Sequence, residues 1–481
     1  MKKLLPALAL CVTVTSYAKN EVYTTPDKGV IYTFADLAKI EGTGVTQIDA
    51  NTFSIVNDID VKAKDGIALT NGMTLQMGAD VLIRIYGSNS KLTPDTATIV
   101  PLGAVKPKGF HLTEIDKSIE LKHVRFEGAG VKIGGPYGVT VENCTFFEHN
   151  DKIGHAAIDF VGSSINNVVR HCYFVRSTCA AVASGANVAA GVTIEDNIME
   201  DCSTANRNYP VINQTPAADN GPVIIRRNKI FGGKRTRPGA LSVSNMMSMI
   251  GDHKIFIEDN YMDNSRYGIN ILGNYMDIRV KGNTVIDCHY ETNAMNGGSG
   301  ITVNSTSEEH PTRVYIEGNR FEGCLWGATI IGKTIANIGH ITGVTETDAD
   351  YNPGRNVFKN NGNCGTAPSG AETAFDPSIP YDLYNNTALT LYAQGNTWGC
   401  EQQTAEEIEK RIFHSADNSS LGQVIFMPAG SGSSGVENIT EDADAVPVMY
   451  VQPSGIMSTT PVKGLNIVKM SDGTTRKIIV K

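Results

Sequence analysis

One pattern of apolar and polar positions recurs along the middle of the chain: apolar, any residue, apolar, two residues of any type, Asn, any residue, apolar. The alternation with a period of two predicts a β-strand. The Asn at a constant offset predicts a turn, because Asn tolerates left-handed backbone and its amide can stack on the next Asn. Units of fixed form that return roughly every 20 to 40 residues predict a solenoid, here a parallel β-helix. The units occupy residues 192–199, 223–230, 255–262, 278–285 and 314–321.

The repeat extends in both directions when Val or Cys may replace the Asn. The same template then fits residues 119–126 and 139–146, and it fits 167–174 except at its first position; weaker copies surround Asn356 and Asn396. Many turns are followed by a second strand that begins with glycine, and we expect this glycine to form a corner. The sequence therefore predicts an all-β solenoid of roughly ten rungs with two strands per rung. The glycines that start these second strands include Gly130, Gly239, Gly268, Gly300 and Gly327.

The two ends differ in composition from the repeats. Residues 1–18 have the basic start, apolar core and small-residue site of a secretory signal peptide, so we expect cleavage before Lys19. Beyond the repeats, a stretch rich in Gly and Ser has the composition of a flexible linker. We expect an N-terminal cap with early rungs at 19–110, the parallel β-helix at 111–428, the linker at 429–445 and a small C-terminal β module at 446–481.

Net charge and hydropathy exclude two classes of function. The charge of −9 becomes −11 without residues 1–18, because Lys2 and Lys3 are removed. An acidic protein has no general affinity for nucleic acid. Outside residues 1–18, no apolar run approaches the length of a membrane span, so we expect no transmembrane segment. The sequence favours a secreted or outer-surface monomer.

Cysteine spacing does not indicate a metal site. No Cys-x-x-Cys and no His-x-x-x-His occurs, so we expect no metal site built on cysteines. Cys144 and Cys172 occupy the stacked Asn position, which predicts small buried turn residues. Cys364 and Cys400 flank the last repeats and could pair in an oxidising compartment.

A row of charges accompanies the repeats. The outward position two residues before each turn residue alternates in sign, and in-register parallel strands about 4.8 Å apart would place each charge between two opposite ones. Each exposed pair contributes only about 0–1 kcal/mol, but the row disfavours a slip by one rung. We therefore interpret this row as architecture. Its members are Lys122, Glu142, Arg170, Glu195, Arg226, Glu258, Lys281 and Glu317.

The second strands have the opposite character. Their outward residues are small and mostly uncharged, and the long loops that lead into them carry Arg, Tyr, His and Trp. Aromatic rings stack on sugars, and arginines form forked bonds with carboxylate or sulfate. We therefore expect a rim that binds polysaccharide, although these arginines could instead pair with neighbouring acids and the aromatics could cover loops. The expected substrate-binding residues are Arg207, Tyr209, Arg266, Tyr267, Asn270, His289, Tyr290 and Trp326.

A further constellation lies in an earlier rung. His149, Asp151, His155 and Asp159 combine His and Asp side chains, which suit acid–base chemistry or a metal site. Alternation after Ile158 points Asp159 outward at the second-strand face. We therefore expect Asp159 to be the member of this group that takes part in chemistry.

The repeats from residue 119 to about 400 resemble the right-handed parallel β-helix superfamily, which includes pectate lyases and polygalacturonases. Residues 355–361 and 393–399 look like the closing rungs of secreted β-helix proteins. The ending at 462–469 and 476–481 resembles the C-terminal sorting domain of proteins secreted by Bacteroidetes, with Asn466 where that family usually has Tyr. This resemblance implies export by that secretion machinery. The polygalacturonase and pectate-lyase signatures are absent, so no family catalytic residue is carried over.

Two functions remain open. One is a polysaccharide-active enzyme: a lyase, with Arg235 or Arg237 neutralising a uronate carboxylate and Asp159 as a metal ligand, or a hydrolase, with Asp159 and Glu291 as its carboxylate pair. A lyase of this kind could require Ca²⁺. The other is a non-catalytic surface protein that binds glycans or other cells through the same rim. In either case we expect the ligand to be an acidic glycan.

Overall fold

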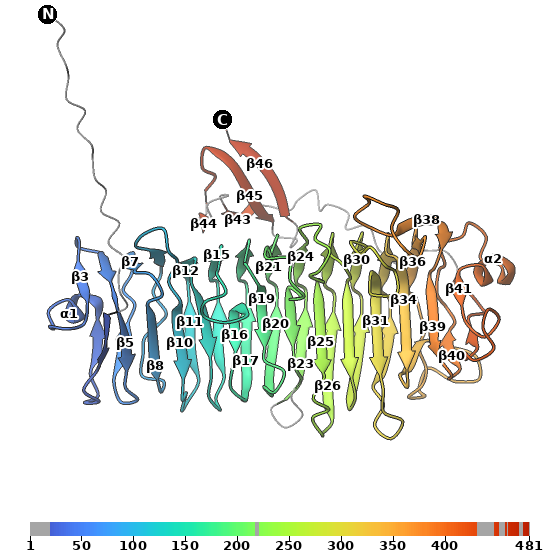
Figure 1. Cartoon of the computed structure of the whole chain (residues 1–481), viewed down its shortest axis with the longest axis horizontal. Coiled ribbons are helices and arrows are strands. Elements are labelled where there is room, and N and C mark those ends of the chain that lie inside the picture. The colour runs from blue at the N-terminus through green and yellow to red at the C-terminus, as the bar shows by residue number, and fades with distance from the viewer. Residues whose placement is uncertain are drawn as a thin grey trace, which may run out of the picture.

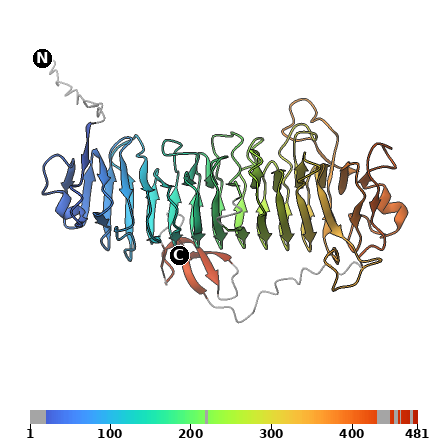
Figure 2. The ribbon, with the colours of Figure 1, turned by 90° about the horizontal axis from the view of Figure 1, so that it is seen from below.

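A computed structural model describes residues 20–216, 221–430, 447–451, 457–458, 460–470 and 475–480, so the expected signal peptide and most of the expected linker lie outside the described residues. The chain winds into a long parallel β-helix whose strands form three sheets along its length (Figure 1). Seen from below, successive rungs stack from the N-terminal end to the end that carries α2 (Ala405–Glu409) (Figure 2). The all-β parallel solenoid expected from the repeats is confirmed.

Sheet I contains the glycine-initiated strands and runs the whole length of the solenoid. Its neighbouring strands are parallel and in register. In spatial order its strands are β1 (Asn20–Thr24), β5 (Asn57–Val61), β8 (Leu82–Tyr86), β10 (Gly109–Thr113), β13 (Gly130–Ile133), β16 (Ala156–Phe160), β19 (Ala180–Ser184), β22 (Ile212–Gln214), β25 (Leu241–Asn245), β28 (Ile269–Gly273), β31 (Ser299–Ser305), β34 (Trp326–Gly332), β39 (Leu383–Thr387) and β41 (Ile412–Phe413).

Sheet II contains the alternating strands that precede the Asn position. Its continuous run begins at residue 119, and shorter parallel pairings of residues 31–33 with 66–68, of Ala68 with Lys91 and of Leu92 with Leu121 extend it toward the N-terminus. Its strands are β11 (Ile119–Lys122), β14 (Val139–Glu142), β17 (Ser164–Arg170), β20 (Ala190–Glu195), β23 (Val223–Arg226), β26 (His253–Glu258), β29 (Met276–Lys281), β32 (Arg313–Glu317), β35 (Ile335–Gly339), β40 (Leu391–Ala393) and β42 (Val424–Ile425).

Sheet III consists of short strands between the Asn position and the glycine corner, so each central rung has three strands and the expectation of two was wrong. A three-residue strand has one inward side chain and shows no alternation in sequence. Its strands are β3 (Val45–Gln47), β4 (Thr52–Ile55), β7 (Met73–Met77), β9 (Ala97–Pro101), β12 (Val124–Glu127), β15 (Thr145–Phe147), β18 (Tyr173–Val175), β21 (Ile198–Glu200), β24 (Lys229–Phe231), β27 (Tyr261–Asp263), β30 (Thr284–Ile286), β33 (Arg320–Glu322) and β36 (Val357–Lys359).

Smaller elements complete the described chain. Near the N-terminus, α1 (Phe34–Leu37) follows an N-cap at Thr33 that forms a capping box with Asp36. Among the described residues, no helix is long and apolar enough to cross a membrane. The remaining elements are α1 (Phe34–Leu37), β2 (Ile31–Thr33), β6 (Gly66–Ala68), β37 (Gly362–Asn363), β38 (Phe375–Pro380), β43 (Pro447–Val451), β44 (Met457–Ser458), β45 (Gly464–Met470) and β46 (Thr475–Val480).

The expected C-terminal module is a four-stranded antiparallel sheet formed by β43 to β46. Asn466, the residue that departs from the sorting-domain pattern, is fully buried. Its side chain accepts a hydrogen bond from the Val462 N–H at 3.1 Å and donates one to the Val462 carbonyl at 2.6 Å. The amide therefore closes the turn before β45.

The Asn positions form a continuous buried ladder. Each Asn backbone N–H donates to the Oδ1 of the next Asn, as between Asn228 and Asn260 at 3.0 Å and between Asn260 and Asn283 at 3.0 Å. Cys172 continues the ladder upstream by donating its N–H to Asn197 at 2.9 Å. The left-handed residue is the one before the Asn, for example Asp259 with a φ of 53°. The ladder is therefore confirmed, but the strained backbone lies one position earlier than expected.

The glycines at the start of the sheet I strands are required by close packing. A Cβ at Gly268 would lie 2.5 Å from the Gly300 carbonyl oxygen, and one at Gly300 would lie 2.7 Å from that of Gly327. None of these three has a positive φ. Each rung is therefore held against the next at a point where no side chain fits.

The alternating charges of sheet II are Cα partners from each strand to the next, as predicted. Glu142 lies between Lys122 at 3.2 Å and Arg170 at 3.1 Å, and Arg226 reaches Glu195 at 2.7 Å. These cations hold the pKa of Glu142 below its usual value against the opposing effect of burial. These contacts join neighbouring rungs, which supports the interpretation of the row as architecture.

All eight cysteines among the described residues are free. Cys144, Cys172, Cys202, Cys288 and Cys324 are buried turn residues, as expected. The anticipated bond between Cys364 and Cys400 is not formed.

Candidate functional site

The side chains of one outward row of sheet I change in character along the solenoid. Its members are Cα partners from strand to strand along the whole sheet. The row is charged at its N-terminal end, small and neutral in the middle, and aromatic at its C-terminal end. In order it contains Asp60, Arg84, His111, Lys132, Asp159, Ala183, Asn213, Ser242, Asn270, Thr302, Thr329, Tyr384 and Phe413.

The two cations at the charged end have different surroundings. Arg84 is neutralised, because it forms ion pairs with Asp60 and, at 3.4 Å, with Asp58. Lys132 is half-buried, and no carboxylate within the described part of the chain lies within 4.0 Å of its ammonium group. Lys132 is therefore a cation that is free to bind an anion.

Lys132 lies between two titratable groups with shifted pKa values. Burial, with the Lys132 and Arg84 charges, lowers the pKa of His111 to about 4, so its imidazole is neutral at pH 7. Burial raises the pKa of the Asp159 carboxyl, and the His155 N–H bond and the Lys132 charge only partly offset this effect. A neutral imidazole, an ammonium group and a carboxyl with a raised pKa therefore follow one another at spacings of about 4.8 Å.

The loops before β16 and β22 add polar groups at the edge of this end. The His155 backbone N–H donates to Asp159 Oδ2 at 3.1 Å, and the His155 ring stacks on Tyr209 with centroids 5.3 Å apart. Arg207 forms an ion pair with Asp151 at 3.3 Å. The structure thus brings together Asp159, His155, Tyr209 and Arg207, four of the residues that the sequence singled out.

His149 does not belong to this group. Its ring is completely buried at a turn position, neither ring nitrogen has a hydrogen-bond partner, and burial lowers its pKa to about 3. The ring packs where a Cβ on Gly130 would lie 2.7 Å from it. His149 is a core residue, and its place in the candidate constellation was wrong.

Arg235 and Arg237, which were expected to be catalytic, lie away from Asp159. Arg235 forms an ion pair with Asp201 at 2.6 Å, which is the alternative that the sequence left open. Arg237 is exposed, and its backbone N–H donates to Asn206 at 3.1 Å. Both lie in the loop before β25, three strand spacings from Asp159, or about 14 Å.

The carboxylate pair expected for a hydrolase is not formed. Asp159 is on β16 and Glu291 precedes β31, which places them five strand spacings, or about 24 Å, apart. Two carboxylates that act on one glycosidic bond lie no more than about 10 Å apart. Glu291 is instead paired with Arg266 at 2.6 Å and is only 7% exposed.

Other expected sugar-binding residues pack within the rim. The Tyr267 ring is 7% exposed and rests on Gly239, where a Cβ would lie 1.9 Å from it, and burial raises its pKa to about 12. His289 stacks on Phe375 with centroids 4.3 Å apart, and burial lowers its pKa. The ring centroid of Tyr290 lies 4.9 Å from that of His289. Asn270 remains on the outward row, where its amide donates to Ser242 at 3.5 Å.

Trp326 is part of an aromatic pocket of about 390 Å³ at the other end of sheet I. Its ring centroid lies 4.5 Å from that of Tyr381 and 5.2 Å from that of Tyr384, and its indole N–H donates to the Ala294 carbonyl at 2.9 Å. Phe413 meets Tyr384 edge-on at 5.2 Å. The residues around the pocket are Ala294, Met295, Trp326, Asn363, Cys364, Gly365, Ile379, Tyr381, Tyr384 and Phe413.

Arg84, His111 and Lys132 were not predicted as site residues from the sequence. Lys132 stands in one of the glycine-initiated strands, between Val131 and Ile133, so alternation alone marked it as outward. His111 and Arg84 lie in rungs without the Asn marker, where no repeat gave a register.

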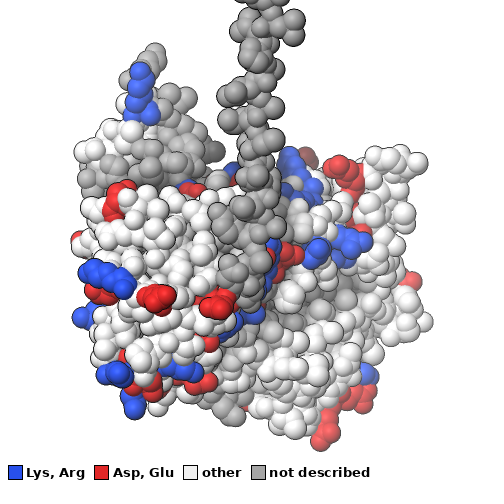
Figure 3. Space-filling view, turned by 60° about the vertical axis from the view of Figure 1, so that its left-hand side comes forward, with Lys and Arg blue, Asp and Glu red and all other residues white. Residues whose placement is uncertain are grey.

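The charges elsewhere do not form a broad patch in the view that brings the N-terminal end forward. In Figure 3, basic and acidic side chains are interspersed, and much of the visible surface is uncharged. Within the described residues, no group of three or more His, Cys, Asp or Glu side chains could hold a metal ion. A role for Ca²⁺ stays a prediction.

Comparison with known proteins gives similarity in overall structure. No protein-family model and no curated protein matches the sequence. The solved structures that match are of the periplasmic alginate epimerase AlgG. One variant of that enzyme has a TM-score of 0.38 and 12% sequence identity over 82% of this chain and 83% of the other. A second variant has a TM-score of 0.35 and 12% identity over 82% and 84%.

Proposed function

We propose that this protein acts on a uronate-containing polysaccharide by removing the proton next to the sugar carboxylate. The observation that carries the proposal is the unpaired, half-buried Lys132 between His111 and Asp159. That proton is weakly acidic while the carboxylate is charged, because removing it places a second negative charge beside the first. A cation on the carboxylate stabilises the resulting intermediate.

Lys132, His111 and Asp159 have different roles. Lys132 binds the carboxylate, and His111, neutral at pH 7, accepts the proton. The substrate carboxylate also cancels the Lys132 charge that helps to depress the pKa of His111, which makes His111 a stronger base in the complex. Asp159 fixes the His155 loop through its hydrogen bond at 3.1 Å and so positions His155 and Tyr209 at the edge of the site.

Two products can follow from the same intermediate. Loss of the sugar at C4 gives an unsaturated end, which is the lyase outcome. Return of a proton from the opposite side inverts C5, which is the epimerase outcome. The proton-donating group on that side decides between them, and the Tyr209 hydroxyl is the candidate.

The test is a panel of uronate polymers incubated with the full chain. Near-ultraviolet absorbance reports elimination, and NMR of the recovered polymer reports inversion. We expect one of the two signals, and a loss of at least about 100-fold in His111→Gln. The control is His310→Gln, which changes an exposed histidine that stacks on Tyr275. Neither signal on any polymer, or full activity in His111→Gln, would reject the proposal.

The second candidate is a non-catalytic glycan binder. It is favoured by the aromatic pocket at Trp326, which needs no nearby base to hold a sugar. Binding to the panel without proton removal would support this candidate.

We also propose that the chain is exported with the help of its C-terminal module. The observation is the separate antiparallel sheet of β43 to β46, which carries the residues that resemble a sorting domain. Removal of residues 446–481 is expected to leave the protein in the periplasm, as measured by cell fractionation. Unchanged export would reject this role.

A further inference from the structure

The aromatic pocket lies on the same outward row as the proposed reaction centre. Tyr384 and Phe413 are the register successors of Thr329, and the row leads back through Asn270 to Lys132. Lys132 on β13 and Tyr384 on β39 are separated by eight strand spacings, or about 38 Å.

The walls of the pocket are held by backbone hydrogen bonds between two loops. In the 287–298 loop, the Ala294 N–H donates to Gly365 at 2.8 Å. In the 360–382 loop, the Ala367 and Ala374 N–H groups donate to Thr292 at 2.7 Å and to Glu291 at 2.8 Å. The pocket is therefore pre-formed, which lowers the entropy lost when a ligand binds.

The composition of the pocket determines what it can hold. Its lining has aromatic rings and backbone groups but no charged side chain. Met295 and Ile379 in the lining are 68% and 42% exposed, so the pocket opens to solvent through apolar atoms. The apolar face of a pyranose ring fits such a surface, whereas a free carboxylate would find no cation there.

We propose that this pocket is a remote sugar-binding subsite that holds the polysaccharide by a pyranose ring, with any carboxylate of that ring turned to solvent. This inference rests on the proposed function, because it takes the same polymer as the ligand. A pyranose unit and a rung are of similar length, on the order of 5 Å. A polymer that follows the row therefore reaches both sites only with about eight sugars or more. The pocket then makes the protein selective for long chains.

Trp326 provides a direct optical readout. The chain has two tryptophans, and Trp398 is 2% exposed, stacked on Phe358 within the core. Titration of the full chain with oligouronates of about four and about twelve sugars should change the Trp326 emission, with the longer chain binding at least about tenfold more tightly. Trp326→Phe should abolish the change in emission.

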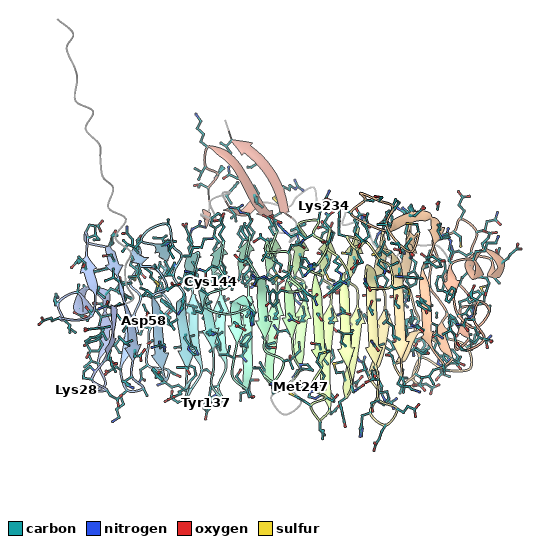
Figure 4. All side chains as sticks on the ribbon, in the orientation of Figure 1. Lys28, Asp58, Tyr137, Cys144, Lys234 and Met247 are labelled. Atoms are coloured by element: carbon teal, nitrogen blue, oxygen red, sulfur yellow. The ribbon has the colours of Figure 1, made fainter. Side chains whose placement is uncertain are left out.

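The variant that tests affinity is Tyr384→Ala, with Tyr384→Phe to show that the ring is what matters. We expect Tyr384→Ala to weaken binding of the long chain about tenfold, and Tyr384→Phe to bind like the parent protein. The control is Tyr137→Ala: Tyr137 is 44% exposed and lies at the lower edge in Figure 4, away from the loop edge that carries Lys234.

The outcomes separate this inference from the proposed function. The protein could remove the proton with a KM for the polymer that depends neither on chain length nor on Tyr384→Ala. That result would overturn the inference and leave the proposed function intact. Binding that depends on Tyr384 and on the emission of Trp326, without proton removal, would support the subsite and overturn the proposed function. An unchanged emission of Trp326 at saturating long oligouronate would overturn the subsite directly.

Discussion

Lys132 and Asp159 are Cα partners on the adjacent strands β13 and β16, with Lys132 unpaired and Asp159 only 5% exposed. The carboxyl hydrogen-bonds to the His155 N–H at 3.1 Å and forms no ion pair with the ammonium group. This arrangement leaves the Lys132 charge available to an anion, whereas Arg84 of the same row and Arg226 of the sheet II row are paired with carboxylates.

Reversal of one charge in the sheet II row should destabilise the solenoid. Glu195 receives hydrogen bonds from Arg226 at 2.8 Å and Arg227 at 2.9 Å, and its side chain is 12% exposed. Glu195→Lys replaces these attractions by repulsion, so we expect the free energy of unfolding to fall by about 2 kcal/mol. Urea denaturation measures the change. Glu406→Lys, at a site 86% exposed, is the control, and equal stabilities of the two variants would contradict the role of the row.

Removal of one Asn from the buried ladder should lower the free energy of unfolding more than Glu195→Lys does. Asn260 accepts from the Asn228 N–H at 3.0 Å and donates to the Ile225 carbonyl at 2.8 Å. Asn260→Ala leaves both groups buried without partners, so we expect a loss of about 3 kcal/mol or more. The exposed Asn208→Ala is the matched control in the same denaturation assay. A loss below that of Glu195→Lys would show that the ladder does not hold the rungs together.

As the pH falls below neutral, the free energy of unfolding should decrease, in part because of His149. Its folded pKa is about 3, against about 6.5 in the unfolded chain. As the pH falls from about 6.5 to about 3, the unfolded state binds a proton that the folded state does not, so the folded state loses stability across this window. His149→Cys places there the residue that Cys202 and Cys288 supply in the equivalent turns. We expect a smaller decrease in stability between neutral and acid pH, and an unchanged decrease would contradict the assignment.

Glu291 should prove structural. Because its carboxylate is paired with Arg266 and accepts the Asn293 N–H at 3.1 Å, Glu291→Gln should reduce the free energy of unfolding by about 2 kcal/mol. Turnover per folded molecule should not change. Glu372→Gln, an exposed change on the neighbouring loop, is the control. A loss of turnover in Glu291→Gln without a loss of stability would restore this residue as a catalyst.

The repeat made the fold predictable, because each Asn and each alternating charge repeats the same local physics in every rung. Asn260 and Glu195 could be placed by counting alone. The predictions of strands were wrong or incomplete where the repeat gave no register. Sheet III strands such as β18 have one inward residue, and the sheets continue into early rungs with no Asn.

The candidate site was predictable only in part. Asp159 and Trp326 were identified, since alternation and residue type both marked them. Lys132 was missed because a lone lysine in a strand has no distinguishing spacing, and its significance comes from His111 and Asp159 on adjacent rungs. Glu291 and Tyr267 were misassigned because sequence does not show the partners, Arg266 and Gly239, that bury them.

Loss of the C5 proton of a uronate polymer in deuterated water, measured by NMR, tests most directly whether Lys132 assists proton removal. The C5–H signal is lost whichever product follows, because inversion replaces this hydrogen by deuterium and elimination leaves C5 without hydrogen. The parent protein should remove the C5–H signal, Lys132→Met should slow this loss at least about 100-fold, and Lys281→Met, which changes an exposed lysine of the sheet II row, should match the parent. Equal rates of C5–H loss with Lys132→Met and with the parent protein would contradict proton removal assisted by Lys132.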